Sequence, residues 1–231
     1  RRAGVKEMLT ASVNVPDSIE AVALCRRFEG VYCAVGIHAH EADRFRSMDI
    51  QALKDLCIEP QVKAIGETGL DYFRSFSSKA NQETAFRAQI ELAKMMNLPL
   101  VIHIRDAGYR VKAILEEYGH FSGVLHCFSG DRKLAEWAVE RGFYISFSGS
   151  LTYGEQRLAD VAKAVPCDRL MIETDAPSLV PASERGKMTR NEPALVRLTL
   201  VHLAGLVGLT PVQLAAQTRE NARRCFRIGE K

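Results

Sequence analysis

Side chains that can bind a metal ion recur in this sequence at or just beyond the ends of short apolar runs. The stretch "VKAIGETGLD" carries Glu67, "LPLVIHIRD" carries His103, "GVLHCFS" carries His126 and "LMIETDAP" carries Asp175. A carboxylate at the end of an apolar segment is costly unless a cation meets it. Imidazole and carboxylate groups together suit zinc, manganese, iron or magnesium, and the histidines argue against calcium. The sequence therefore predicts a site for one or two divalent metal ions.

Two histidines and an arginine accompany these candidates. The stretch "YCAVGIHAH" ends in His38 and His40, and Arg105 follows His103 by two residues. Side chains two apart on a strand share one side, so Arg105 is predicted to point the same way as His103. A lone histidine on a strand is more commonly a hydrogen-bonded core residue than a ligand. A shared site is nevertheless the better interpretation, because histidines and carboxylates recur together at strand ends.

Two further acidic residues have simpler interpretations. Glu173 lies two residues before Asp175 and is predicted to hold either Arg105 or a ligand histidine in orientation. An aspartate directly after a strand is usually an N-cap or turn residue, and we interpret Asp71 in that way.

Seven apolar runs, rich in branched residues, alternate with segments of helical period. The predicted strands are Glu7–Val13, Val31–Gly36, Val62–Gly66, Leu100–Ile104, Gly123–Cys127, Phe143–Ser148 and Arg169–Glu173. Strict alternation of strand and helix implies a parallel sheet covered by helices. The spacing of the strands favours an α/β fold of the (β/α)8 TIM barrel type, and no GxGxxG loop is present. Such a barrel brings the carboxyl ends of its strands, and hence the candidates, to one face.

The strand count is one short of eight. Such barrels usually need about 250 residues, whereas this chain has 231. The opening "RRAGVKEML" reads like the end of a helix that runs into a strand, without an initiator methionine. We therefore expect the first β-α unit to be missing, and residues 1–231 to form a single TIM-barrel hydrolase domain.

The basic stretch "SERGKMTRNEPA" follows the last predicted strand. The last loops of such barrels commonly bind phosphate. Arg190 and Asn191 are predicted to open a helix, where backbone N–H groups favour anions, so both are candidate substrate contacts. Arg185 and Lys187 fit a solvated surface equally well. Together with Arg105, this loop favours a phosphodiester substrate.

The composition of the sequence argues against a membrane protein and against a disulfide-bonded protein. No apolar run reaches the ~18 residues of a membrane helix, and no signal peptide is evident, so no membrane partner is expected. Six cysteines lie scattered without CxxC spacing and read as reduced thiols of a cytoplasmic protein. The net charge of +3 is too small to imply nucleic acid binding by itself.

Several motifs in order resemble one known family. The sequence resembles the TatD family of metal-dependent deoxyribonucleases from about residue 3 to residue 227, and the motifs are "GIHAH", "AIGETGLDYFR", "QIELAKMMNLPLVIHIRDA", "GVLHCFSG", "GFYISFSG", "IETDAPSLVP", "RNEPA" and "ENARRCF". The resemblance implies an amidohydrolase-like TIM barrel. It also implies a cytosolic hydrolase that cleaves DNA phosphodiesters with divalent metals, often from the 3′ end, with a DNA single strand or 3′ end as substrate.

The resemblance also implies roles for individual residues. Glu67 would bridge two metal ions, and His103 and His126 would bind one of them. Asp175 would bind the other ion and orient or deprotonate the attacking water. The residues implied to contact the scissile phosphate are His38 and His40. Many members carry a further H-x-H pair on the first strand, which is the strand expected to be missing here, so the number of ions stays open.

Two other functions fit the same residues. An amidohydrolase acting on a cyclic amide or lactone would use the same barrel and metals, although its bridging group is often a carbamylated lysine rather than a residue such as Glu67. A barrel without its first strand could instead be a non-catalytic remnant that only binds. Metal content and turnover distinguish these alternatives.

Overall fold

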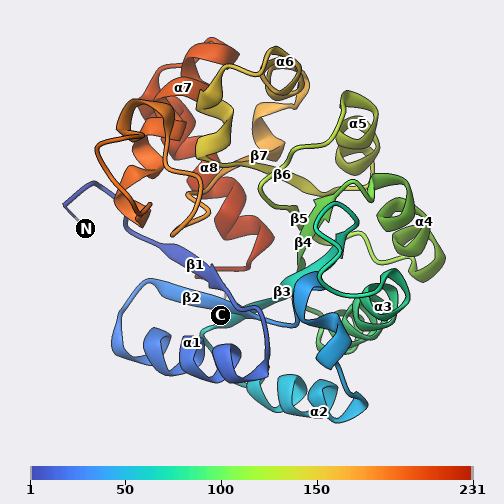
Figure 1. The fold of residues 1–231 in the computed structure, drawn as a ribbon. Coiled ribbons are helices and arrows are strands. Elements are labelled where there is room, and N and C mark those ends of the chain that lie inside the picture. Colours follow the sequence, from blue (N-terminus) through green and yellow to red (C-terminus); the bar gives the residue numbers. More distant parts are fainter. Residues whose placement is uncertain (1, 230–231) are drawn as a thin grey trace. The chain divides into compact units, whose positions relative to one another are not determined.

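The computed structural model describes residues 2–229, in which seven strands alternate with helices (Figure 1). The strands are β1 (Met8–Ala11), β2 (Val31–Val35), β3 (Val62–Asp71), β4 (Leu100–Arg105), β5 (Gly123–Leu125), β6 (Tyr144–Phe147) and β7 (Leu170–Ile172). All seven predicted strands are confirmed, although their ends differ. The predicted domain of residues 1–231 includes positions 1, 230 and 231, which lie outside the described residues, and its being a single domain stays a prediction.

Helices follow most of these strands. The α-helices are α1 (Val15–Arg27), α2 (Ser47–Leu56), α3 (Lys79–Met96), α4 (Gly108–Tyr118), α5 (Arg132–Glu140), α6 (Gln156–Ala164), α7 (Val196–Val207) and α8 (Pro211–Cys225). Short 3₁₀ helices are η1 (Ala39–Arg44), η2 (Gly149–Tyr153), η3 (Cys167–Arg169), η4 (Ala182–Glu184) and η5 (Pro193–Leu195).

The long helix α3 shows why these segments are helical. The Ser78 side chain caps it by accepting a hydrogen bond from the Asn81 N–H at 3.2 Å. Phe86, Ile90 and Ala93, spaced three and four residues apart, form a face that is wholly buried. Burial of this apolar face stabilises the helix far more than its intrinsic propensity does.

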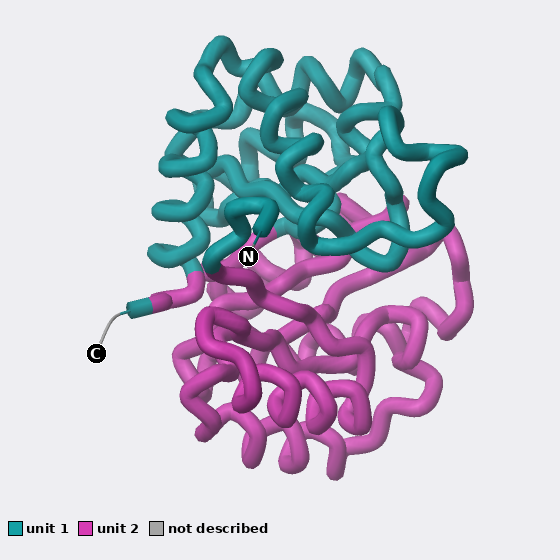
Figure 2. The backbone as a smooth tube through the Cα atoms, turned by 90° about the vertical axis from the view of Figure 1, so that its left-hand side faces the viewer, with its two compact units in different colours: residues 1–6, 125–225, 229–231 teal, residues 7–124, 226–228 magenta. Residues whose placement is uncertain are grey.

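The chain divides into two compact units, which Figure 2 shows in different colours. Unit 1 comprises residues 1–6, 125–225 and 229–231, and unit 2 comprises residues 7–124 and 226–228.

Unit 2 contains the parallel strands β1 to β4, which pair in chain order. Met8 lies opposite Val31 where β1 and β2 begin their ladder. The largest wholly buried side chains of this unit come from strands and helices alike; they include Leu53, Ile65, Leu70, Phe86, Ile90 and Ile102. The apolar sequences of these strands are those expected for a parallel sheet, because strands that are covered by helices on both faces consist of continuous apolar runs.

Strand β3 extends past its predicted end at Gly66 because it contains a β-bulge. The ladder with β4 pairs Ile65 with Leu100 and resumes at Thr68, so one extra residue lies on β3. Within the bulge, the Glu67 N–H donates to the Ser12 carbonyl at 2.8 Å. Gly66 is required here, because a Cβ atom would lie 2.6 Å from the Val101 carbonyl oxygen.

In unit 1, β6 and β7 pair in parallel, with Ile145 opposite Leu170. The buried side chain of Asn221 on α8 donates hydrogen bonds to the carbonyls of Cys167 and Leu170 at 2.8 and 2.7 Å, so this helix anchors the start of β7. Thr210 caps the start of α8, because its side chain accepts a hydrogen bond from the Gln213 N–H at 3.3 Å.

Among the described residues, no single helix is long and apolar enough to cross a membrane. One pair of consecutive helical segments, Pro193–Val207 and Pro211–Cys225, passes the same test of length and composition together, with a bend of 107° between them.

Candidate metal centre

Among residues 2–229, each unit contains a cluster of side chains that can bind a metal. The β2–β4 cluster in unit 2 consists of His38, His40, Glu67, Asp71 and His103. The β5–β7 cluster in unit 1 consists of His126, Glu173 and Asp175, whose ligand atoms lie within 4.8 Å of one another. All these residues lie in strands or follow strand ends, as the sequence predicted for most of them.

Glu67 stands between two imidazole rings. Its Oε1 atom lies 3.1 Å from His38 Nε2 and 3.0 Å from His103 Nδ1. His38 follows β2 as the N-cap of η1, His103 belongs to β4, and the bulge turns Glu67 of β3 towards both. The structure therefore brings together three predicted site residues from three neighbouring segments.

The hydrogen bonds of His38 determine its tautomer. Its Nδ1 atom accepts a hydrogen bond from the backbone N–H of His40 at 3.0 Å. A nitrogen that accepts carries no proton, so the ring is neutral and its proton is on Nε2. The Nε2–H group therefore donates to Glu67 Oε1, and His38 presents a hydrogen-bond donor rather than a metal ligand at this atom.

Asp71 is the functional candidate that the sequence interpretation missed. It is the last residue of β3 and wholly buried. Its Oδ1 atom accepts from the N–H groups of Phe73 and Arg74, which is the expected turn role. Its Oδ2 atom lies 2.8 Å from His40 Nε2 and 3.1 Å from His103 Nε2. The turn interpretation was therefore incomplete, because one carboxylate also links two histidines.

A spacing rule could have found Asp71. Residues four apart on a strand share one face, and Asp71 follows Glu67 by four. Burial alone would raise the pKa of Asp71, but hydrogen bonds from His103, Arg74 and His40 outweigh it, and the pKa lies far below its ordinary value. Asp71 is accordingly an anionic acceptor.

The contact with Asp71 makes His103 suitable as a metal ligand. If its Nε2–H group donates to Asp71, the lone pair of the neutral ring lies on Nδ1, 3.0 Å from Glu67 Oε1. A lone pair and a carboxylate oxygen repel each other at this distance unless a proton or a cation lies between them. Carboxylate–histidine pairs of this kind commonly orient metal ligands, so the donor set fits a divalent ion.

His40 is held in the same way. Burial lowers its pKa, against the opposing effect of the hydrogen bond with Asp71, so the neutral ring is favoured. Its Nε2–H group then donates to Asp71, and its Nδ1 atom is an acceptor. The predicted contact of His40 with a phosphate stays a prediction.

In the β5–β7 cluster, His126 directly follows β5. Its Nδ1 atom lies 3.1 Å from Glu173 Oε1. Of the two predicted partners of Glu173, the structure thus shows the histidine. Because Nδ1–H donates to the carboxylate, the lone pair of neutral His126 lies on Nε2, which is the atom able to ligate.

The charge of Glu173 is stabilised locally. Burial alone would raise its pKa, but the His126 ring, a hydrogen bond from Ser146 and the backbone N–H of Cys127 lower it below the ordinary value. Asp175 follows two residues later with a positive φ of 55°, in a turn closed by the Ser178 N–H. Aspartate tolerates this left-handed conformation better than most residues do.

The side chain of Asn191 has a structural role near Asp175. It is buried, and its side-chain amide donates to the carbonyls of Thr174 and Ser178 at 2.5 and 2.7 Å. It thereby holds the segment that carries Asp175. Arg190 is exposed, and the helix begins only at Pro193, so neither residue opens it as predicted.

Arg105 is half-buried at the end of β4. Its guanidinium carbon lies 4.1 Å from the centre of the exposed Phe73 ring, a cation–π contact. Such a contact leaves the planar N–H groups of arginine able to bind phosphate oxygens at their edge.

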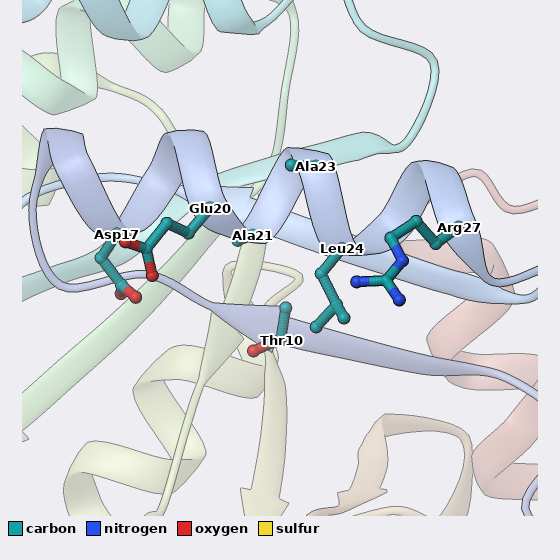
Figure 3. Close-up of a pocket in the computed structure, with 7 residues that line it drawn as sticks. All are labelled: Thr10, Asp17, Glu20, Ala21, Ala23, Leu24 and Arg27. Carbon is teal, nitrogen blue, oxygen red and sulfur yellow. The ribbon is translucent and has the colours of Figure 1, made fainter.

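A groove also runs along helix α1 in unit 2 (Figure 3). It has a volume of about 390 Å³, and its lining residues are Thr10, Asp17, Glu20, Ala21, Ala23, Leu24 and Arg27. No histidine is among them, so this groove lacks the metal-binding chemistry of the two clusters.

The alternating fold and the imidazole–carboxylate clusters define a metal-dependent hydrolase of the TIM-barrel class, as predicted. The family model for TatD related DNase matches residues 1–227, and the chain belongs to this family.

Known proteins of this family are similar over nearly the whole chain. The uncharacterized metal-dependent hydrolase YabD of Bacillus subtilis is 39% identical, over 97% of this chain and 89% of that protein. The 3′-5′ ssDNA/RNA exonuclease TatD of Salmonella typhimurium is 37% identical, over 98% of this chain and 89% of that protein. The crystal structure of YjjV, a TatD homologue from Escherichia coli, matches with a TM-score of 0.90 at 25% identity, over 98% of this chain and 88% of that one.

Proposed function

We propose that this protein is a divalent-metal-dependent phosphodiesterase that shortens single-stranded DNA or RNA from its 3′ end. The observation that carries the proposal is the 3.0 Å approach of His103 Nδ1 to Glu67 Oε1, since a divalent ion can take the place of a proton between an imidazole and a carboxylate of this kind. Related proteins with the printed name of a 3′-5′ ssDNA/RNA exonuclease support the substrate.

Both clusters supply metal ligands in this proposal. Glu67 and His103 are the ligands from unit 2, and His126 and Asp175 are the ligands from unit 1. One or two ions of zinc, manganese, iron or magnesium suit this mixture of imidazole and carboxylate groups. When bound, such an ion lowers the pKa of water towards ~7 and polarises the phosphate.

The protein side chains orient the reactants. When Glu67 binds metal, the Nε2–H group of His38, which donates to Glu67 in the structure, becomes available to donate to a non-bridging oxygen of the scissile phosphate. Asp175 accepts the proton of the attacking water. Glu173 fixes the ring of His126, and Asp71 fixes the rings of His103 and His40.

Cationic side chains complete the substrate site. Arg105 and Arg190 are proposed to bind phosphate groups of the strand, because both carry a permanent charge and a planar set of donors. Asn191 supports this site indirectly, through the segment that it holds.

The direct test compares substrates and variants. Protein stripped of metal and reloaded with zinc, manganese or magnesium is assayed on bis(p-nitrophenyl) phosphate, on a 5′-labelled oligonucleotide and on a cyclic amide. We expect both phosphodiesters to be cleaved, with products that shorten from the 3′ end. Glu67→Gln should lower turnover by at least about 100-fold. Glu59→Gln, which removes a surface partner of Arg26, is the matched control and should change little.

Other results would identify the rival functions. Turnover of the cyclic amide or of a lactone, without phosphodiester cleavage, would establish an amidohydrolase. Metal binding without turnover on any of these substrates would establish a non-catalytic scaffold. We also propose a cytoplasmic location, because six cysteines without paired spacing suit a reducing compartment. Cell fractionation tests this location.

A further inference from the structure

Two large aromatic side chains are exposed beside the β2–β4 cluster. They lie in the segment between β3 and α3, residues 72–78, which we call the aromatic loop. The exposed fractions of Phe73 and Phe76 are 57% and 62%, although Leu70 just before the loop is wholly buried. Exposed phenylalanine is common enough singly, but two within four residues next to a candidate active site suggest a binding surface.

The loop lies directly against the cluster. The ring of Phe76 packs edge-to-face with His40, with ring centres 4.8 Å apart. His40 in turn contacts the ring of His38 with centres 4.3 Å apart, and His38 donates to Glu67. Two rings, those of His40 and His38, thus connect Phe76 to Glu67, one of the proposed metal ligands.

Positive charge is interleaved with these rings. The guanidinium group of Arg105 lies 4.1 Å from the centre of Phe73, and the ammonium group of Lys79 lies 4.5 Å from the centre of Tyr72. Arg74, between the two phenylalanines, is exposed. Proteins that bind single-stranded nucleic acid combine aromatic rings for the bases with cations for the backbone in this way.

The loop is held in place by the same residues that organise the cluster. Asp71 Oδ1 accepts from the N–H groups of Phe73 and Arg74 at 3.1 and 2.8 Å. The buried side chain of Gln82 bonds to the Asp71 backbone and to the Ser77 carbonyl. The Ser77 hydroxyl donates to the His40 carbonyl at 2.8 Å. Both ends of the loop are thus fixed, so a ligand that stacks on it loses little loop entropy.

We propose that Phe76, with Phe73 and Arg105 beside it, forms a stacking platform for a nucleobase next to the scissile phosphate of a single-stranded substrate. The inference rests on the proposed nuclease function and adds the part of the substrate that is recognised. Because every base has a flat face, the platform selects unpaired strands without selecting a sequence. Bases paired in a duplex are already stacked and are not available to it.

The test removes the aromatic ring of Phe76 from the protein and, separately, the 3′-terminal bases from the substrate, and it asks whether the two changes affect the same interaction. Wild type, Phe76→Leu and Phe76→Trp are assayed on a thymidine oligomer and on a matching oligomer whose 3′-terminal residues carry no base. Stacking on an aromatic side chain corresponds to a preference of about 5- to 150-fold per base. We expect wild type to prefer the thymidine oligomer by such a factor in kcat/KM. The preference should fall to about twofold or less in Phe76→Leu and return in Phe76→Trp.

A matched control is available in the same unit. Phe28, at the end of α1, is 50% exposed and also carries an arginine over its ring, with Arg27 at 5.6 Å, but it precedes β2 rather than following a strand. Phe28→Leu should keep the wild-type preference. Thermal denaturation of each variant shows whether the fold is retained.

The outcomes separate this inference from the proposed function. If wild type cleaves neither oligomer nor bis(p-nitrophenyl) phosphate, the nuclease function fails, and the platform with it. If wild type cleaves the oligomers but Phe76→Leu keeps the full preference for bases, the platform alone is refuted. Equal losses on both oligomers would also refute it, since the preference for bases would then not depend on Phe76.

Discussion

His103 Nε2 lies 3.1 Å from Asp71 Oδ2, at the end of a strand where Asp71 is wholly buried. The same oxygen is 2.8 Å from His40 Nε2. One carboxylate oxygen thus fixes the ring orientation of two neighbouring histidines, and with the His103 proton on Nε2 the Nδ1 lone pair of that ring points towards Glu67. The ring orientation of His103, and with it the direction of its free nitrogen, therefore depends on Asp71.

Replacing Asp71 by asparagine should weaken metal binding by about 10- to 100-fold, the usual effect of losing such a partner. The amide can still accept from the Phe73 and Arg74 N–H groups, so the turn should survive. Metal affinity is measured by competition with a chelator, independently of activity. Asp43→Asn, which alters a carboxylate that caps the Ser78 N–H, is the control. Unchanged affinity in Asp71→Asn would show that Asp71 only shapes the turn.

Replacing Asp175 by asparagine should abolish hydrolysis while the protein still folds. The amide can hydrogen-bond, but it is a poor metal ligand and no base, so kcat should fall by at least about 100-fold. Turnover of bis(p-nitrophenyl) phosphate and circular dichroism are the two measurements. Near-normal turnover by Asp175→Asn would show that Asp175 is not required for hydrolysis.

Replacing the exposed Arg190 by alanine should raise KM for oligonucleotides more than it lowers kcat. A group that binds substrate and transition state alike has this effect. The dependence of KM on salt should also become weaker, because one fewer phosphate contact releases counterions. Arg224→Ala, on the exposed side of α8, is the control. The same KM at two salt concentrations in Arg190→Ala and wild type would contradict the assignment.

The pair formed by Glu83 and Arg110 predicts a pH dependence of stability. Hydrogen bonds from Arg110, against the effect of burial and with help from Tyr72, lower the pKa of Glu83 below its ordinary 4.5. Ionised Glu83 therefore stabilises the fold at neutral pH, and this contribution is lost as the pH falls from 4.5 through the lower folded value.

Urea unfolding across this acid range checks the sign of the effect. The free energy of unfolding should fall less steeply with decreasing pH in Glu83→Gln than in wild type. Glu136→Gln, in an exposed ion pair with Arg132, should follow wild type. Identical curves for wild type and Glu83→Gln would show that the pair contributes nothing.

Replacing Gly66 by alanine should destabilise the fold by about 2–4 kcal/mol. The new Cβ would lie 2.6 Å from the Val101 carbonyl oxygen, at a φ of 152° that glycine favours. Gly205→Ala is the matched control: it lies within α7 with nothing within 4 Å of the added atom, and it should stabilise by about 0.5–1 kcal/mol. Thermal or urea unfolding measures both. A neutral Gly66→Ala would mean that the bulge beside Glu67 tolerates a side chain.

The sequence by itself determined the order of strands and helices. Buried parallel strands read as apolar runs, and the segments between them carry the repeating apolar face of a helix, as Phe86, Ile90 and Ala93 do in α3. It also located Glu67, His103, His126 and Asp175, because polar groups at the carboxyl ends of parallel strands stand out against their apolar surroundings.

Only the tertiary structure decided how these groups are arranged. The bulge at Glu67 depends on the register between β3 and β4, and the role of Asp71 depends on two histidines that lie 31 and 32 residues away. The hydrogen bonds of Asn191 could not be predicted for the same reason, since its partners are backbone carbonyls of another segment. Local patterns encode burial and period, whereas tautomers and shared hydrogen bonds arise from contacts between residues distant in sequence, which no local pattern records.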